Sequence, residues 1–447
     1  MVMEENLIPG LPDDIGMECL VRVPHRYHCH LRSVCRRWRD LLSLPLFYSL
    51  RDRSGTAEDL LFLIQATTTT TTTTTIGTSE TMEPPPTPSS TSEATDEEWK
   101  NQHQEQQVVQ RLCCFSPPVY GLTVYNATDG TWLKMAPPPP KFFFPTFCQC
   151  VSLPPARLIL FGGWDPETLE PIPDVYVYDF VAGRGGGWRR GAPMSEARSF
   201  FACAVAVTSS NSVHVYVAGG HDSQKNALRS AEVYDVDADE WRALPPMSKE
   251  RDECHGLIDD DSGRFWVLSG YPTDSQGQFG ESAEFYDPTM GEWSSYGGTG
   301  SGEGRMWEFP ASSPRSSCIA LRTMSSLSPP LTTPDMPPSI WYIDCGGRSL
   351  KEYDRAEGRW KVVGAIPDGL RSSPCCTYLS SGTAGVHHHP NNHQRNTRIF
   401  VIGGSDGEQQ QQRHRGWLLD VGSGKWAPLE VSSEFSGFVY SASALRL

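Results

Sequence analysis

Short apolar segments, each followed by a turn and a tryptophan, recur through most of this 447-residue chain. The clearest example runs from Tyr286 to Trp293, where the apolar segment ends in Asp287 and a turn containing Pro and Gly leads to the Trp. Each segment predicts a β-hairpin whose second strand begins at the Trp. The same six-residue spacing from an acid or amide to a Trp begins at Asn126, Asp235, Asp354 and Asp420. A sixth copy, 178–188, has three additional residues in a Gly-rich turn.

A pair of small residues ends the apolar run that precedes most of these hairpins. Glycine pairs allow positive φ and close backbone approach, which converging sheets require. The pairs are Gly162-Gly163, Gly219-Gly220, Gly346-Gly347 and Gly403-Gly404, with a weaker version at Ser269-Gly270. The tryptophans recur every 52 to 67 residues, a spacing typical of propeller blades built from four strands.

The two ends of the repeat region predict how the ring closes. Residues 437–447 form one apolar strand with no hairpin after it, while Leu60–Gln65 is an isolated strand candidate ahead of the first hairpin. Six hairpins and one spare strand predict six blades, with the C-terminal strand completing blade one and removing the open sheet edges. We therefore assign 120–447 to the propeller. Residues 52–119 contain the first strand candidate and a Thr- and Gln-rich insertion, which we expect to be disordered because it has few apolar residues.

The N-terminal residues 7–51 have helical spacing instead. Leu11-Pro12 opens a first helix, since Pro suits the first helical position. A second segment places apolar residues at offsets 0, 3, 4, 7, 10 and 11, which predicts one further helix with a buried face that Pro45 limits. These residues are Leu31, Val34, Cys35, Trp38, Leu41 and Leu42. A helical unit of about 45 residues is near the lower limit for independent folding, so it should lean on a partner.

These patterns carry two family resemblances. Gly-Gly, Tyr-Asp and Trp, once per four-stranded unit over roughly 120–447, resemble the kelch repeat. Leu-Pro at 11–12, Leu20-x-x-Val23-Pro24 and Leu31-Arg32-x-Val34-Cys35-x-x-Trp38-Arg39 resemble an F-box. The resemblance implies a mainly β protein: a six-bladed kelch β-propeller preceded by a small α-helical F-box within residues 1–51. A small helical cap on the propeller is the alternative for the N-terminal unit.

The combination resembles the plant-type F-box/kelch-repeat proteins, which are substrate receptors of SCF-type cullin–RING ubiquitin ligases. It implies that the F-box binds a Skp-family adaptor, and through it a cullin, while the propeller binds a target protein for ubiquitination and proteasomal degradation. Relatives target phenylpropanoid enzymes or cytokinin-response regulators. The implied adaptor-binding residues are Leu11, Pro12, Ile15, Leu20, Val23, Pro24, Leu31, Val34, Cys35 and Trp38.

The composition limits the partners and the cell compartment that we expect for this protein. A net charge of −15 and a pI near 5.3 argue against a nucleic-acid or acidic-membrane surface. No apolar stretch approaches 18 residues, so we expect a soluble protein of the cytoplasm and/or nucleus, and its 13 Cys residues should be reduced thiols. We expect no cofactor and no metal site, because the His387–His389 run with His393 reads as a low-complexity loop.

Catalytic motifs are not found, but one group of cations repeats. The chain lacks GxSxG, HExxH, a phosphate loop and paired carboxylates, so we expect no catalytic residues. A propeller enzyme or small-ligand sensor with a helical cap is the alternative function. Each of four arginines stands just before a blade's opening strand, a position that in kelch propellers lies near the central axis. They could form a substrate-binding ring, or each could pair with a neighbouring acid. The four are Arg198, Arg251, Arg315 and Arg371.

Overall fold

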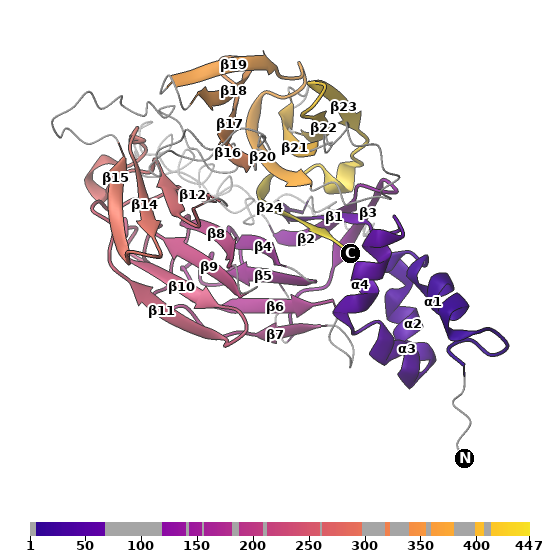
Figure 1. Ribbon diagram of the computed structural model, residues 1–447. Helices are drawn as coiled ribbons and strands as arrows, with labels where there is room; N and C mark the ends of the chain where they lie inside the picture. Colours follow the sequence, from indigo (N-terminus) through magenta and orange to yellow (C-terminus); the bar gives the residue numbers. More distant parts are fainter. Residues whose placement is uncertain are drawn as a thin grey trace, which may run out of the picture.

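The described part of the chain forms a six-bladed β-propeller with a small helical domain against one side (Figure 1). The computed structural model describes residues 6–67, 119–139, 143–153, 156–180, 187–208, 212–259, 262–296, 318–321, 339–354, 359–379, 398–405 and 413–447. Within these ranges lie six antiparallel four-stranded sheets, which confirms the predicted fold class. No helix in the same ranges is long and apolar enough to cross a membrane.

The blades follow one another along the chain. Blade one contains β24 (Val439–Arg446), β1 (Asp59–Ala66), β2 (Tyr120–Asn126) and β3 (Thr131–Met135), and blade two contains β4 (Gln149–Leu153), β5 (Arg157–Phe161), β6 (Val175–Asp179) and β7 (Trp188–Arg190). Blade three contains β8 (Ala202–Val207), β9 (Val213–Ala218), β10 (Ala231–Asp235) and β11 (Glu240–Leu244), and blade four contains β12 (His255–Ile258), β13 (Phe265–Leu268), β14 (Ala283–Asp287) and β15 (Glu292–Tyr296). Blade five contains β16 (Cys318–Leu321), β17 (Ser339–Asp344), β18 (Ser349–Asp354) and β19 (Arg359–Ala365), and blade six contains β20 (Ser372–Leu379), β21 (Arg398–Ser405), β22 (Arg413–Asp420) and β23 (Lys425–Leu429).

Ring closure occurs as the sequence predicts. Strand β24 pairs antiparallel with β1, with Leu61 opposite Ala444. Glu58 and Leu447 continue this pairing through two backbone hydrogen bonds of 2.6 and 3.0 Å. The chain's last strand thus covers the inner edge of blade one, and β1 occupies the strand position expected at 60–65.

The recurring Trp of each hairpin joins neighbouring blades. In five of the six hairpins its ring packs beside the Tyr opposite it, as Trp241 does with Tyr234, and in blade six the residue opposite Trp426 is Leu419. Its Nε1 donates to a backbone carbonyl at the end of the preceding blade, for example from Trp241 to Ala192 at 2.7 Å and from Trp293 to Pro245 at 2.6 Å. A Trp fits because it fills apolar space and still satisfies one polar atom.

The second glycine of the Gly pair is required by a close backbone contact in blades two and three. The predicted pairs at 346–347 and 403–404 differ, because a Cβ atom at Gly347 or Gly404 would first meet a side chain, that of Asp344 or Ser372. Gly220 has φ +84°, and a Cβ atom there would lie 2.3 Å from the carbonyl oxygen of Ser199. Gly163 has φ +85°, with the carbonyl oxygen of Thr146 only 2.4 Å from such a Cβ. Any other residue would clash with the backbone at the start of the blade's first strand.

The helical domain contains α1 (Asp13–Val21), a 3-10 turn (His25–Tyr27), α2 (His28–Val34), α3 (Arg36–Leu41) and α4 (Pro45–Arg53). The prediction of one helix through 31–42 is wrong at Cys35, where the backbone is extended with φ −154° and ψ 169°. Cys35 Sγ accepts a hydrogen bond from the Trp38 N–H and caps α3. Pro45 begins α4 because its fixed φ suits the first turn, so the predicted end of the domain at 51 falls inside a helix.

Several sequence predictions lie outside the described residues. These are the disorder expected for the insertion after Thr67, the interpretation of the His387–His389 and His393 segment, and the position of Arg315.

Candidate functional site

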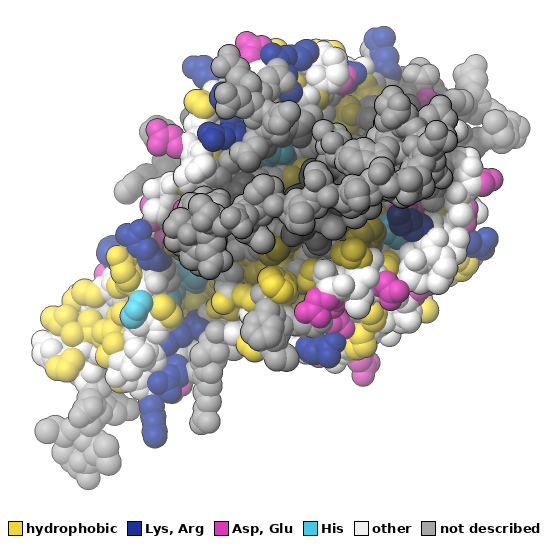
Figure 2. Space-filling view, turned by 180° about the vertical axis from the view of Figure 1, so that it is seen from behind, with side chains coloured by type: hydrophobic (Ala, Val, Ile, Leu, Met, Phe, Trp, Pro, Cys, Tyr) yellow, Lys and Arg dark blue, Asp and Glu magenta, His cyan; other side chains and the backbone are white. Residues whose placement is uncertain are grey.

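The helical domain exposes large apolar side chains away from the propeller. Val34 at the end of α2 is 60% exposed, Ile15 on α1 is 47% exposed and Leu46 on α4 is 56% exposed. Figure 2 shows hydrophobic side chains gathered over this domain. Large apolar groups left in water on so small a domain indicate an interaction surface.

The structure divides the ten predicted adaptor-binding residues into two groups. Pro12, Ile15, Val34 and Cys35 are exposed and available to a partner. The others hold the domain together: Leu20 is buried, and Leu11, Val23, Pro24, Leu31 and Trp38 are partly buried. The indole Nε1 of Trp38, for example, donates to the Leu7 carbonyl at 2.7 Å. Adaptor contact by the exposed group stays a prediction.

Sequence reasoning missed two exposed apolar residues, Leu44 and Leu46, which flank Pro45 at the start of α4. Helical spacing gives no clear signal for Leu44, because it precedes α4 as its N-cap and stands three residues before the buried Phe47. The two leucines extend the exposed apolar group to a third helix.

The helical domain is packed directly against blades one and two. One hydrophobic cluster joins Val21, Leu42 and Phe47 of the helices to Phe62 and Phe180 of the propeller. Arg32 crosses the same boundary and donates to the carbonyl of Phe180. The helical domain and the propeller therefore share one core.

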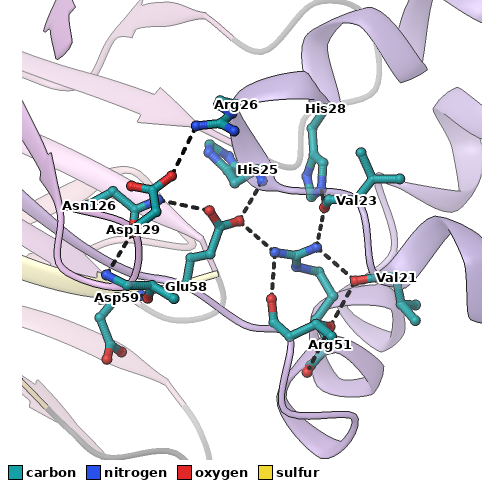
Figure 3. A network of polar contacts seen from close by, with 12 residues as sticks. Val21, Val23, His25, Arg26, His28, Arg51, Glu58, Asp59, Asn126 and Asp129 are labelled. Carbon is teal, nitrogen blue, oxygen red and sulfur yellow. Dashed lines mark hydrogen bonds and ion pairs between the residues drawn. The ribbon is translucent and has the colours of Figure 1, made fainter. Parts of the chain in front are cut away.

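A buried polar network lies beside this cluster (Figure 3). The fully buried Arg51 on α4 donates to the carbonyls of Val21 and Val23 at 2.8 and 2.6 Å, and to Glu58 Oε2 at 2.8 Å. The same oxygen of Glu58 accepts from the backbone N–H of His25. Glu58 Oε1 accepts from the side-chain amide of Asn126, on blade one, at 2.8 Å. The carboxylate of Glu58 thus connects the helices to the propeller.

Two histidines at this junction are neutral. Burial, with the nearby Arg51 and Arg32 charges, lowers the pKa of His25 to about 3. Burial, followed by the neighbouring His25 and Arg51, lowers the pKa of His28 to about 2. His28 Nε2 lies 3.1 Å from the Val23 carbonyl, so the neutral ring has a backbone partner. The junction therefore contains Arg51 as its paired charge and excludes protonated imidazole.

The predicted arginine ring is corrected at Arg198, whose side chain is fully buried. Its guanidinium donates to the carbonyls of Gly219 and Ser230, at 2.9 and 3.2 Å, and to Glu232 Oε1 at 3.1 Å. Glu232 also accepts from the Ser195 N–H at 2.9 Å. The side chain holds the ends of β9 and β10 together, and the pairing alternative therefore applies.

Arg251 has the same role in blade four, where it is 3% exposed. It donates to the carbonyls of Ser269 and Ser282, at 2.6 and 3.0 Å, and to Glu284. The sequence contains a signal for this arrangement, because Ser-Ala-Glu precedes an apolar residue and Tyr-Asp in both blades. Arg371 is exposed, and its backbone N–H donates to the Gly404 carbonyl. Its contact with a substrate stays a prediction.

An aromatic cluster lies where the first strands of blades one to three begin. Phe147 and Phe200 both have positive φ, 55° and 57°, which is unusual for a bulky residue. Their ring centroids are 5.0 Å apart, and Tyr440 lies 5.3 and 5.6 Å from them. Trp164 packs against both phenylalanines. Rings from three blades thus meet at one end of the propeller.

His221 adds a polar group to this cluster. Its ring stacks on Phe200, and its Nδ1 lies 3.0 Å from both carboxylate oxygens of Asp252. In the part of the chain that the structure describes, neither His221 Nε2 nor the Ser199 hydroxyl has a hydrogen-bond partner. The hydroxyl is therefore not bonded to the imidazole, as a nucleophile and its base would be.

Comparisons with known proteins agree with this architecture. The F-box domain family matches residues 8–50, and the Kelch motif matches residues 202–248. The F-box/kelch-repeat protein SKIP20 of Arabidopsis thaliana is 40% identical over 98% of this chain and 96% of its own length. The F-box/kelch-repeat protein At2g44130 of the same plant is 45% identical over 69% of this chain and 68% of its own. An F-box implies binding to a Skp-family adaptor, and kelch propellers bind protein targets. The chain belongs to the F-box/kelch-repeat family, whose members generally serve as non-catalytic substrate adaptors of SCF-type ubiquitin ligases.

Proposed function

We propose that this protein is the substrate-recognition subunit of an SCF-type ubiquitin ligase. The F-box binds a Skp-family adaptor, and the propeller holds the protein that receives ubiquitin. The chain supplies proximity, because it raises the concentration of target lysines near a charged ubiquitin-conjugating enzyme. The target is a protein of the cytoplasm or nucleus, with phenylpropanoid enzymes and cytokinin-response regulators as candidates.

The exposed apolar group on the helices is the observation that carries the proposal. Ile15, Val34 and Leu46 lie on three different helices and remain in water, whereas other apolar residues of the domain pack against the propeller. Burying one such side chain in an interface contributes roughly 1.5–3 kcal/mol. Because these side chains are 47–60% exposed, a partner that covers all three gains part of this free energy at each of them.

For the target, we propose contact at the aromatic cluster. Trp164, Phe147 and Phe200 are partly exposed, and backbone strain in bulky residues is retained mostly at functional sites. Aromatic anchors are also the groups that most often dominate protein interfaces.

The adaptor proposal is tested with Ile15→Asp and Val34→Asp in the full chain. Either change should reduce adaptor binding at least tenfold, since it places a charge in an apolar interface, and should leave the melting temperature unchanged. Val207→Asp is the matched control, because Val207 is a 52% exposed residue of the propeller. Adaptor binding that survives both F-box substitutions would contradict the proposed surface.

Targets are identified by affinity purification under ligase inhibition, followed by mass spectrometry. Trp164→Ala should reduce target recovery while adaptor recovery stays constant. Equal target recovery by wild type and variant would place the target elsewhere on the propeller.

A further inference from the structure

One hairpin departs from the repeat. Five of the six Trp hairpins have Asp at the position before the turn, and the hairpin of blade one has Asn126. The turn itself does not explain the difference. Asn126 Oδ1 accepts the Thr128 N–H at 2.9 Å, as Asp235 Oδ1 accepts the Asp237 N–H at 3.0 Å. Asp and Asn serve this turn equally well.

In four of the other blades the Asp lies opposite a basic residue on the neighbouring strand. Asp179 is 3.7 Å from Arg157, Asp235 is 3.6 Å from His214, and Asp287 is 2.9 Å from Arg264. Asp420 is opposite Arg398 in the strand register. A carboxylate in this position therefore has a nearby cation or potential cation.

Blade one differs at the same position. The residue opposite Asn126 is Leu60, which offers no charge. The Asn126 amide instead donates to Glu58, whose carboxylate already accepts from Arg51 and His25. Asn126 and Glu58 are both at least nine-tenths buried. A carboxylate at 126 would face a second carboxylate at hydrogen-bond distance in a buried site, which strongly disfavours ionisation of both.

We propose that Asn126 is a positioning residue, which fixes the F-box on blade one through Glu58 and Arg51. The amide holds the helical domain in one orientation on the propeller. An adaptor bound to the helices is thereby held in a defined place relative to a target on the propeller. This last consequence for ubiquitin transfer rests on the proposed function, whereas the docking itself does not.

Residues of the junction between the helical domain and blade one also contact the strand that closes the ring. Glu58 pairs through its backbone with Leu447, and Arg446 of β24 bonds to Asp52 of α4 at 2.7 Å and to Asp59 of β1 at 2.8 Å. F-box docking and the closing strand are therefore connected by the same short segment, 52–59. Loosening one should loosen the other.

Three variants of the full chain test the proposal. Asn126→Asp changes one amide to a carboxylate and keeps the turn acceptor. Asp235→Asn makes the opposite change in blade three and is the matched control. The double variant Asn126→Asp with Glu58→Gln exchanges donor and acceptor, so that the bond between the two positions is restored and one negative charge remains in the junction, now on residue 126.

Hydrogen exchange of the full chain without adaptor is the first measurement. In Asn126→Asp, amides in 45–58 should exchange roughly tenfold faster, as expected when a local contact opens, while blades three to five stay unchanged. The double variant should return to the wild-type rate and the control should match it throughout. Unchanged exchange in 45–58, or a failure of the double variant to recover, would overturn the proposal.

The second measurement is the distribution of ubiquitin among the propeller's own lysines in a reconstituted ligase, read by mass spectrometry. A merely structural role would not alter this distribution at constant adaptor affinity. Asn126→Asp should change the share at individual lysines at least twofold, and the double variant should restore it. A wild type that binds adaptor but transfers no ubiquitin would contradict the proposed function, and the exchange measurement would still decide the docking role.

Discussion

Arg198 offers a sharp test of whether the repeated arginines are structural. In Arg198→Ala, the carbonyls of Gly219 and Ser230 lose a donor, and Glu232 loses its cation while keeping the Ser195 N–H. Removing one member of a buried ion pair costs about 3–5 kcal/mol because the other charge stays buried without compensation. The retained Ser195 bond places the expected loss near the lower value.

Urea unfolding followed by Trp fluorescence measures the loss. With a slope of about 3 kcal/mol per molar urea, the midpoint of Arg198→Ala should fall by roughly 1 M. Glu232→Ala should have a similar effect, and the double variant should lose less than the sum, because the two residues interact directly. Arg189→Ala is the control, since Arg189 and Asp239 form a pair at 2.9 Å with side chains 45% and 37% exposed. That change should cost less than about 1 kcal/mol.

The opposite result would support the predicted substrate-binding ring of arginines. If Arg198→Ala left the urea midpoint within 0.2 M of wild type, on the scale of about 3 kcal/mol per molar, and target recovery still fell, the guanidinium would be acting on the target. The same comparison applies to Arg251, whose bonds are equivalent.

Two further predictions concern the junction and the glycine pairs. The pKa of His28 is about 2 in the folded chain, against an ordinary value of 6.5. Below pH 6.5, His28 therefore binds a proton in the unfolded chain and not in the folded chain. The free energy of unfolding is therefore at its full value above pH 6.5 and decreases as the pH falls, by up to about 2 kcal/mol between pH 7.5 and 5. Unfolding of His28→Gln across this range should lack that loss, and equal pH dependence in the two proteins would contradict it. Gly220→Ala should destabilise the protein by more than about 3 kcal/mol, because its Cβ atom would lie 2.3 Å from the Ser199 carbonyl oxygen. Gly130 has φ +75° with open space around it, so Gly130→Ala should cost only about 1–2 kcal/mol. Thermal unfolding measures both losses.

The architecture could be predicted from the sequence because the signals for it are local. A strand, a turn and a Trp lie close together in the sequence of each hairpin, and the Gly pairs of blades two and three mark strand ends where backbones converge. Counting hairpins and the spare strand 437–447 was sufficient for six blades and for ring closure, because an unpaired edge strand is unfavourable. The F-box motif was equally readable from the spacing of Leu11-Pro12 and Trp38.

Details within the helices depended on local backbone choices that apolar spacing does not encode. Residues 31–42 keep one apolar stripe whether the helix is continuous or broken at Cys35, because the break is capped by the Cys35 side chain and the chain resumes helical geometry at once. Periodicity does not report whether each hydrogen bond in the series is made, and it does not report that Val34 and Cys35, at the break, are exposed.

Which charged groups are buried could not be predicted from the sequence and is known from the folded structure. Arg198 and Arg371 stand at equivalent places before a strand, yet the first is enclosed by Glu232 and two carbonyls and the second is exposed. Likewise, Asn126 reads as an ordinary turn residue until Glu58, 68 positions earlier, is placed beside it. The free energy of a charged or amide group depends on the partners that folding brings around it, and those partners come from distant parts of the chain.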